Sequence, residues 1–294
     1  MIPIVAEGSV FFDGFDLVPR LSHPEGVAVH VDGSVWCGSE TGELFRINPD
    51  GSRAEVVADL GGFLLGIAFD NQGNIYVCHQ QRKTVLRLDP GGDNPVELYT
   101  PGQGPALPNY PVVDVARNRL YVSDSHRDPD GKVAIWVIDL KDGGAKPWSQ
   151  YPFSFANGMA LSPDATSLFV VATWDRAIFQ VAIDPSGEPG EVTVFADNLP
   201  GLPDGVALTQ DGQVVVSCYE PSQILVIEDN REARILIHDE TAHLMCHPTN
   251  IAFRGSELFT ANLGRWHISH VVTDLNGPLS SFPRDLVPGK GKSQ

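Results

Sequence analysis

The sequence predicts an all-β chain folded as a six-bladed β-propeller, with four antiparallel strands in each blade. Two observations support this fold class. Six segments of the 294-residue chain share one pattern of apolar, polar and turn residues, and they recur at a period typical of propeller blades. No segment shows the spacing of apolar residues that an amphipathic helix needs.

The six repeats are spaced regularly along the chain. They begin, in order, at Glu25, Leu65, Asn109, Asn157, Asp204 and Thr249. The intervals between these starts are 40, 44, 48, 47 and 45 residues. A period in the forties with several strands in each repeat indicates a propeller. A β-sandwich is the alternative all-β fold, but it does not explain a regular period.

The first repeat shows the strands of one blade. EGVAVHVDGSVWCGS begins with a short apolar strand, Val27 to Val29, which reaches a turn at Asp32-Gly33. Asp-Gly turns provide the positive φ angles that tight hairpins require. A second strand follows through Val35 and Cys37, a third in ELFRINPDG and a fourth in AEVVADL. The β-branched and aromatic residues in these short runs favour strands.

The two ends of the chain predict how the ring closes. The last repeat contains ELFTANL and HISHVVTD but lacks a clear fourth strand. The strand-like stretch GSVFFDGF precedes the first repeat and could supply the outer strand of the last blade. That closure would leave no open strand edge in the ring. We therefore expect residues 1–294 to form a single domain.

The composition of the chain argues against two classes of binding partner. A net charge of −17 repels nucleic acid and anionic lipid, so we expect neither as a partner. No apolar run approaches the roughly 20 residues of a membrane-spanning helix. The N-terminal stretch MIPIVAEGSVFFDGF does not resemble a signal peptide. None of the four cysteines forms a C-x-x-C pair, and three lie in apolar strand patterns. These features predict a cytoplasmic protein; they do not indicate an oligomeric state.

The first residue of each repeat defines a ring position. Equivalent positions in a propeller surround the axis, so residues just before the innermost strands converge on the central channel. Four of the six carry a carboxylate or amide oxygen, namely Glu25, Asn109, Asn157 and Asp204. Like charges at short range repel unless a cation or a proton lies between them. Hard cations prefer oxygen ligands, so these four residues are the candidate ligands of one divalent cation, with Ca²⁺ favoured and Zn²⁺ or Mn²⁺ as alternatives. Strand capping and channel water are the alternative explanation.

Four segments carry a family resemblance: PEGVAV, FANGMALSPD, LPDGVALTQDG and PTNIAF. They resemble the senescence-marker-protein, gluconolactonase and luciferin-regenerating-enzyme family over nearly the full chain. The resemblance implies a six-bladed propeller and a metal-dependent lactonase acting on a small-molecule cyclic ester. The metal-binding Glu, Asn and Asp of the family would correspond to Glu25, Asn157 and Asp204. Asn109 matches an Asn that binds metal or substrate in relatives.

One position departs from the sugar-lactonases of the family. Some of them have Arg two residues before the Asn that corresponds to Asn109, whereas this chain has Leu107. Loss of that hydrogen-bond donor predicts that simpler or more apolar lactones are better substrates than gluconolactone. The second and third blades also resemble strictosidine-synthase-like propellers and calcium phosphotriesterases. Those activities, or a propeller that only binds a ligand or protein, are the alternatives, because a shared fold does not fix function.

Catalysis and substrate binding have separate candidates. Asp204 is the candidate catalytic residue, acting as a base that activates water or as a nucleophile. The second strand of each blade should end at the same mouth of the channel as the ring residues. Asn109, His79, Asp124 and His126 are therefore candidates for substrate binding, and the last three also for proton relay. Polar loops at the rim are the alternative interpretation.

Two further motifs have simpler explanations. His243 and His247 have the i, i+4 spacing of a helical zinc site, but no H-E-x-x-H motif is present. The segment HRDPDGK at 126–132 faintly resembles a calcium-binding loop but lacks its length and its terminal Glu. We therefore expect a connecting segment at the first motif and a hairpin turn at the second.

Overall fold

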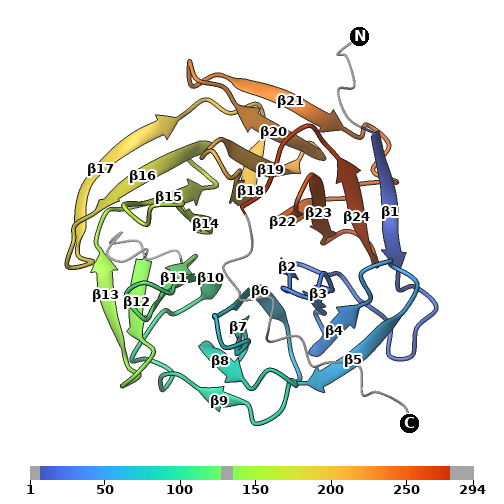
Figure 1. The fold of residues 1–294 in the computed structure, drawn as a ribbon, viewed down its shortest axis with the longest axis horizontal. Helices are drawn as coiled ribbons and strands as arrows, with labels where there is room; N and C mark the ends of the chain where they lie inside the picture. The colour runs from blue at the N-terminus through green and yellow to red at the C-terminus, as the bar shows by residue number, and fades with distance from the viewer. Residues whose placement is uncertain (1–6, 127–134, 279–294) are drawn as a thin grey trace, which may run out of the picture.

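The computed structural model describes residues 7–126 and 135–278, and these residues form 24 strands and no helix. The strands make six four-stranded antiparallel sheets arranged around one axis (Figure 1). The predicted fold class, an all-β propeller with six blades of four antiparallel strands, is confirmed. Residues 127–132, where a hairpin turn was expected, lie outside the described residues.

Blades 1 to 3 each use four strands that follow one another along the chain. Blade 1 contains β2 (Val27–Val29), β3 (Val35–Gly38), β4 (Glu43–Ile47) and β5 (Ala54–Asp59). Blade 2 contains β6 (Leu64–Phe69), β7 (Ile75–His79), β8 (Thr84–Leu88) and β9 (Val96–Glu97). Blade 3 contains β10 (Pro108–Asp114), β11 (Arg119–Asp124), β12 (Ile135–Asp139) and β13 (Ala145–Ser149).

Blades 4 and 5 follow the same order, but blade 6 combines both ends of the chain. Blade 4 contains β14 (Ala156–Leu161), β15 (Ser167–Ala172), β16 (Ala177–Ile183) and β17 (Pro189–Ala196). Blade 5 contains β18 (Leu202–Leu208), β19 (Val214–Glu220), β20 (Gln223–Ile227) and β21 (Ala233–His238). Blade 6 contains β22 (Pro248–Arg254), β23 (Glu257–Asn262), β24 (His267–Val272) and the N-terminal β1 (Glu7–Asp13).

The apolar core lies between the blades. Six clusters of buried apolar side chains each combine residues of two neighbouring blades. Strand β7 shows the cause, because its side chains alternate between the two faces of the sheet. Ile75 and Val77 pack toward blade 1, whereas Tyr76 and Cys78 pack toward blade 3. Both faces of this sheet are therefore buried, and the axis of the ring is left to the innermost strands.

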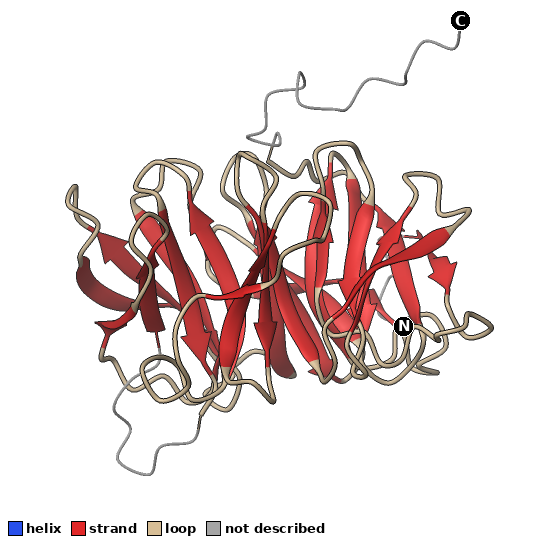
Figure 2. Cartoon of the chain, turned by 90° about the horizontal axis from the view of Figure 1, so that it is seen from below, coloured by secondary structure: helices blue, strands red, loops and turns tan. Residues whose placement is uncertain are grey.

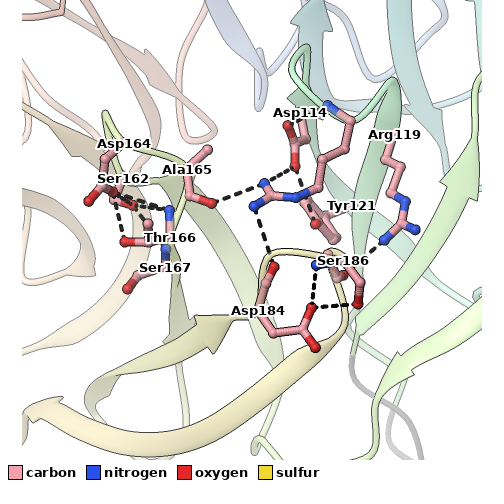
Figure 3. Close-up of polar contacts among 12 residues, drawn as sticks. Asp114, Arg119, Tyr121, Ser162, Asp164, Ala165, Thr166, Ser167, Asp184 and Ser186 are labelled. Atoms are coloured by element: carbon pink, nitrogen blue, oxygen red, sulfur yellow. Dashed lines mark hydrogen bonds and ion pairs between the residues drawn. The ribbon is translucent and has the colours of Figure 1, made fainter.

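A polar seam joins blades 3 and 4 at the face opposite the starts of the innermost strands. The Arg117 guanidinium donates to the buried Asp114 carboxylate (2.8 Å) and to the Ala165 carbonyl of the next blade (3.0 Å). Figure 3 shows Asp114, Ala165 and Asp184 converging on this seam. Hydrogen bonds therefore supplement apolar packing at this interface. The loops gather at the two faces of the disc (Figure 2). Among the described residues there is no helix that could span a membrane.

Closure of the ring depends on β1, which pairs with β24 in an antiparallel register. The ring of Phe11 packs edge to face on Phe259 with centroids 4.8 Å apart. We predict that Phe11→Ala lowers the free energy of unfolding by about 2 kcal/mol, because half-buried aromatic surface is lost at the closing interface. Val10 on the same strand is 44% exposed, so Val10→Ala should change stability by less than about 0.5 kcal/mol. Urea denaturation measures both, and equal effects would contradict closure through β1.

Candidate functional site

A β-bulge lies at the start of five of the six innermost strands. In β14, Ala156 pairs with Ala172 and Met159 pairs with Val170, so three residues on one strand advance against two on its partner. The same shift occurs at the start of β6, β10, β18 and β22. A bulge re-aims side chains and commonly lies beside a functional site. Each of these bulges contains the ring residue of its blade and the residue that follows it.

Glycine follows the ring residue in four blades because neighbouring backbones nearly touch there. A Cβ on Gly158 would lie 2.6 Å from the Asp204 carbonyl oxygen, and one on Gly205 would lie 2.6 Å from that of Thr249. Both distances are too short for a real side chain. The close approach brings adjacent ring residues together across the blade interface.

The polar ring residues are linked across blades. Asn157 Nδ2 donates to Asp204 Oδ2 (3.0 Å), which joins blade 4 to blade 5. Asn250 Nδ2 lies 3.3 Å from Glu25 Oε1 and joins blade 6 to blade 1. These four residues and Asn109 are all buried, with exposed fractions between 0% and 8%.

Each of these five residues keeps one buried oxygen that has no hydrogen-bond partner among the described residues. The atoms are Glu25 Oε2, Asn109 Oδ1, Asn157 Oδ1, Asp204 Oδ1 and Asn250 Oδ1. A buried polar atom without a partner costs roughly 1–3 kcal/mol. Unpartnered oxygens on five residues around one axis are the donor set that a hard cation requires. The residues present therefore fit a divalent cation of the calcium type.

Electrostatics supports the same fit. Burial raises the pKa of Glu25 well above its usual range, the neighbouring charge of Asp204 raises it further, and the hydrogen bond from Asn250 opposes the shift. Burial also raises the pKa of Asp204 to about 7, against the hydrogen bond from Asn157, which lowers it. Two buried carboxylates thus repel each other, and a cation between them would stabilise both charges.

The described residues contain no cluster of three or more His, Cys, Asp or Glu side chains. The ring instead combines two carboxylates with three amides, a set without the nitrogen or sulfur ligands that structural zinc sites use. His243 is exposed, and His247 stacks on Tyr219 with ring centroids 4.4 Å apart. The i, i+4 histidine pair thus belongs to no such cluster in the described structure.

Comparison with known proteins decides the family. Residues 112–262 match the model of the SMP-30/gluconolactonase/LRE-like region, which is half of the chain. The chain belongs to this family. Solved structures share its fold: a gluconolactonase from Xanthomonas campestris superposes with a TM-score of 0.74 at 18% identity, covering 92% of this chain and 90% of that one. The calcium-binding protein regucalcin from Agrobacterium tumefaciens gives 0.74 at 16% identity, covering 93% and 97%.

The curated relatives that the chain resembles in sequence have several different names. A gluconolactonase from Zymomonas mobilis is 26% identical over 224 residues, which cover 72% of this chain and 53% of the relative. Strictosidine synthase-like protein 4 from Arabidopsis thaliana is 28% identical over 216 residues, 66% of this chain. The chain spans 56% to 60% of the length of three such plant relatives.

Asn250 is the ring residue that sequence reasoning missed. The ring was aligned on the first residue of each repeat, which is Thr249 in the last blade, and Asn250 follows it. A signal was available, because four repeats have glycine at this second position and this family member has Asn in blade 6 and Tyr110 in blade 3. A polar side chain in place of a repeated glycine indicates a site where the side chain, rather than close backbone packing, is used.

His79 is the last residue of β7, and both of its ring nitrogens take part in hydrogen bonds. The side chain is buried, Nε2 donates to the Gly61 carbonyl, and Nδ1 accepts from the Arg82 amide (3.2 Å). Burial lowers the pKa of His79, so the imidazole is neutral at pH 7. His79 thus fixes two loops at the mouth, and a direct contact with substrate stays a prediction.

Asp124 shapes the loop that leads to Asn109. Its carboxylate accepts from the amides of Ala106 (2.8 Å), Leu107 (2.9 Å) and His126 (3.0 Å). Asp124 is buried and His126 is exposed at the mouth. The contacts make Asp124 a positioning residue for the strand entry, and the substrate-binding roles of Asp124 and His126 stay predictions.

The carboxylate pair predicts how stability depends on pH when no divalent cation is bound. Between about pH 4, the ordinary carboxyl range, and about pH 7, the folded chain holds protons that the unfolded chain has released. The free energy of unfolding should therefore fall as the pH rises through this window. Urea denaturation in the presence of a chelator measures the slope.

Asp204→Asn should reduce this slope, because it removes one charge and relieves Glu25 as well. Asp197→Asn changes an exposed carboxylate in the loop between β17 and β18 and should keep the wild-type slope. An Asp204→Asn protein with the wild-type pH dependence would contradict the assignment of buried, mutually repelling carboxylates.

Proposed function

We propose that this family member is a lactonase-type hydrolase that depends on one divalent cation, Ca²⁺. Glu25, Asn109, Asn157 and Asp204 would hold the cation, with Asn250 orienting Glu25 and contributing its own oxygen. The observation that carries the proposal is the set of five buried, unpartnered oxygens on residues at, or just before, the starts of the innermost strands. When bound, the cation supplies Lewis-acid polarisation of the ester carbonyl and stabilises the oxyanion.

Two side chains of the ring have separate roles in the proposed reaction: Asp204 acts on water or on the carbonyl, and Asn157 orients Asp204. Asp204 Oδ2 accepts a hydrogen bond from the amide of Asn157 (3.0 Å), which fixes the orientation of the carboxylate. In the proposed mechanism Asp204 takes the proton from the water that attacks the carbonyl carbon, the ring C–O bond breaks, and the proton passes to the departing ring oxygen. Alternatively, the Asp204 carboxylate attacks the carbonyl carbon, the same bond breaks as the ring oxygen takes a proton from water, and the resulting hydroxide hydrolyses the acyl-aspartate. Asn157 holds the carboxylate in orientation on either route. Burial of the ring excludes bulk water, which strengthens each of these interactions.

The relatives support this reading of the site. The gluconolactonase relatives and neighbours favour a small lactone as substrate, and the calcium-binding neighbour favours the cation. The plant strictosidine synthase-like relatives support a strictosidine-synthase-like activity as the alternative enzyme class. Unpartnered carboxylate and amide oxygens on the axis favour cation-dependent hydrolysis over that alternative. The four cysteines are free thiols, which supports a cytoplasmic location as proposed from the sequence.

The cation is tested by binding. Removal of the cation with a chelator should lower the melting temperature, because a ligand that binds only the folded state stabilises it. Glu25→Gln removes one of the two ring charges and should weaken Ca²⁺ binding by at least about tenfold, measured by calorimetry. Glu191→Gln, which changes an exposed carboxylate on β17, is the matched control. Unchanged affinity in Glu25→Gln would refute the ligand set.

The catalytic role of Asp204 is tested by Asp204→Asn at saturating Ca²⁺. The substitution preserves size and one oxygen but removes charge and basicity. Lactone hydrolysis should fall by about 100-fold or more, the usual contribution of a general base, while metal analysis shows the cation still bound. If activity follows cation occupancy alone, Asp204 is a ligand only. Full-rate hydrolysis by wild-type protein after cation removal would rule out the mechanism.

A further inference from the structure

A second ring of side chains lies above the oxygen ring, two residues before each ring position. We call it the upper tier. Its members are His23, Phe63, Leu107, Phe155, Leu202 and His247. All six are half-buried, whereas the next residue and the ring residue of every blade are buried. The upper tier is therefore the first layer of the mouth that keeps exposed side-chain surface.

The chemistry of the upper tier is uneven around the ring. Blades 2 to 5 follow one another around the ring and contribute four apolar residues, Phe63, Leu107, Phe155 and Leu202, which we call the apolar arc. Blades 6 and 1, which are neighbours in the closed ring, contribute His247 and His23. No tier position carries a carboxylate, ammonium or guanidinium group. A concave site with mostly apolar walls and a few polar groups is the usual form of a small-molecule pocket.

The two histidines of the tier are fixed by one loop. His23 Nδ1 bonds the Leu263 carbonyl (2.7 Å), and the Leu263 amide donates to the His247 carbonyl (3.1 Å). His247 also stacks on Tyr219 and bonds the Tyr219 carbonyl through Nδ1 (3.1 Å). In both imidazole rings Nδ1 therefore donates a hydrogen bond to a backbone carbonyl. The imidazoles thus form a rigid polar edge.

The backbone is strained at three of the six positions of the upper tier. His23, Phe155 and His247 have φ angles of 46°, 65° and 51°, in the left-handed region that bulky side chains rarely adopt. Three equivalent positions share this conformation, and strained backbone concentrates at binding sites. Phe155 is further held by an edge-to-face contact with Trp174, with centroids 5.4 Å apart.

Charge near the mouth argues against an anionic ligand. Arg82, Arg176 and Arg265 lie in the loops between the second and third strands of blades 2, 4 and 6. Each of them donates to a backbone carbonyl, at Leu60, Leu199 and Ala242 respectively. These guanidinium groups therefore hold loops together. With a net charge of −17, the chain also repels anions at long range.

We propose that the upper tier is the substrate pocket and that it takes an uncharged lactone with a hydrocarbon substituent. The substituent lies on the arc of Phe63, Leu107, Phe155 and Leu202, and the oxygen-bearing end faces His23 and His247. The inference rests on the proposed lactonase function and adds the substrate class to it. It also separates this chain from enzymes that bind a polyhydroxylated sugar lactone.

A homologous series of γ-lactones tests the proposal with full-length protein and saturating Ca²⁺. From γ-butyrolactone to γ-decalactone, kcat/KM should rise by roughly threefold for each methylene that the arc covers. Gluconolactone should be a poorer substrate than γ-decalactone. A flat dependence on chain length, with lactones still hydrolysed, would overturn the pocket assignment and leave the lactonase function standing.

Variants locate the effect in the tier. Leu107→Ser should lower kcat/KM for γ-decalactone by a factor at least about threefold larger than its effect on γ-butyrolactone. Val194→Ser is the matched control, since Val194 is 55% exposed on the outer strand of blade 4, and it should change neither substrate. Equal losses for Leu107→Ser and Val194→Ser would contradict the proposal.

Binding without turnover separates the pocket from the reaction. The γ-lactam with a hexyl side chain has the shape of γ-decalactone but resists hydrolysis, and pyrrolidinone is its unsubstituted counterpart. Calorimetry should show at least about tenfold tighter binding of the hexyl lactam, reduced in Leu107→Ser. If no lactone is hydrolysed but this difference is found, the pocket stands and the proposed function fails. Equal affinity for the two lactams would overturn the pocket, whatever the catalytic result.

Discussion

Every blade is buried on both faces by its neighbours, and the rest of the structure depends on this constraint. Each of the six apolar clusters belongs to two blades at once, so no blade can bury its side chains alone. The sheets must therefore complete a ring, and β1 is paired with β24 to do so. Because the core lies between the sheets, the axis receives only the starts and edges of the innermost strands, and polar side chains can occupy it.

The oxygen ring follows from how closely the blades approach the axis. Gly158 and Gly205 let neighbouring backbones pack so closely that an added Cβ would lie under 3 Å from backbone atoms of the next blade. The bulges turn the preceding side chains inward. The result opposes stability, since Glu25 and Asp204 are buried together and several oxygens lack partners. Such a site persists only when the surrounding fold determines it and when a ligand offsets its cost. The residues proposed to bind the cation are therefore the same ones whose burial lowers the stability of the fold.

The sequence was sufficient for the blade count and for most of the ring. A period near 45 residues reports the blade directly, since each blade is one complete supersecondary unit. Glu25, Asn109, Asn157 and Asp204 could be found because they occupy one register position. Asn250 lies one residue later in its repeat, where the bulge directs it toward Glu25 (3.3 Å), so an alignment on the first residue of each repeat misses it. The asparagine in place of the repeated glycine is the signal that could have found it. The hydrogen bonds of His79 and Asp124 depend on loop conformation, which a strand pattern does not encode.

The central claim is that the oxygens on the axis hold one cation, and a crystal grown with Ca²⁺ tests it most directly through anomalous scattering. The account predicts a single anomalous peak on the propeller axis, about 2.3–2.6 Å from oxygens of Glu25, Asn109, Asn157 and Asp204. An enzymatically active crystal form saturated with Ca²⁺ that shows no peak at this position would contradict the account.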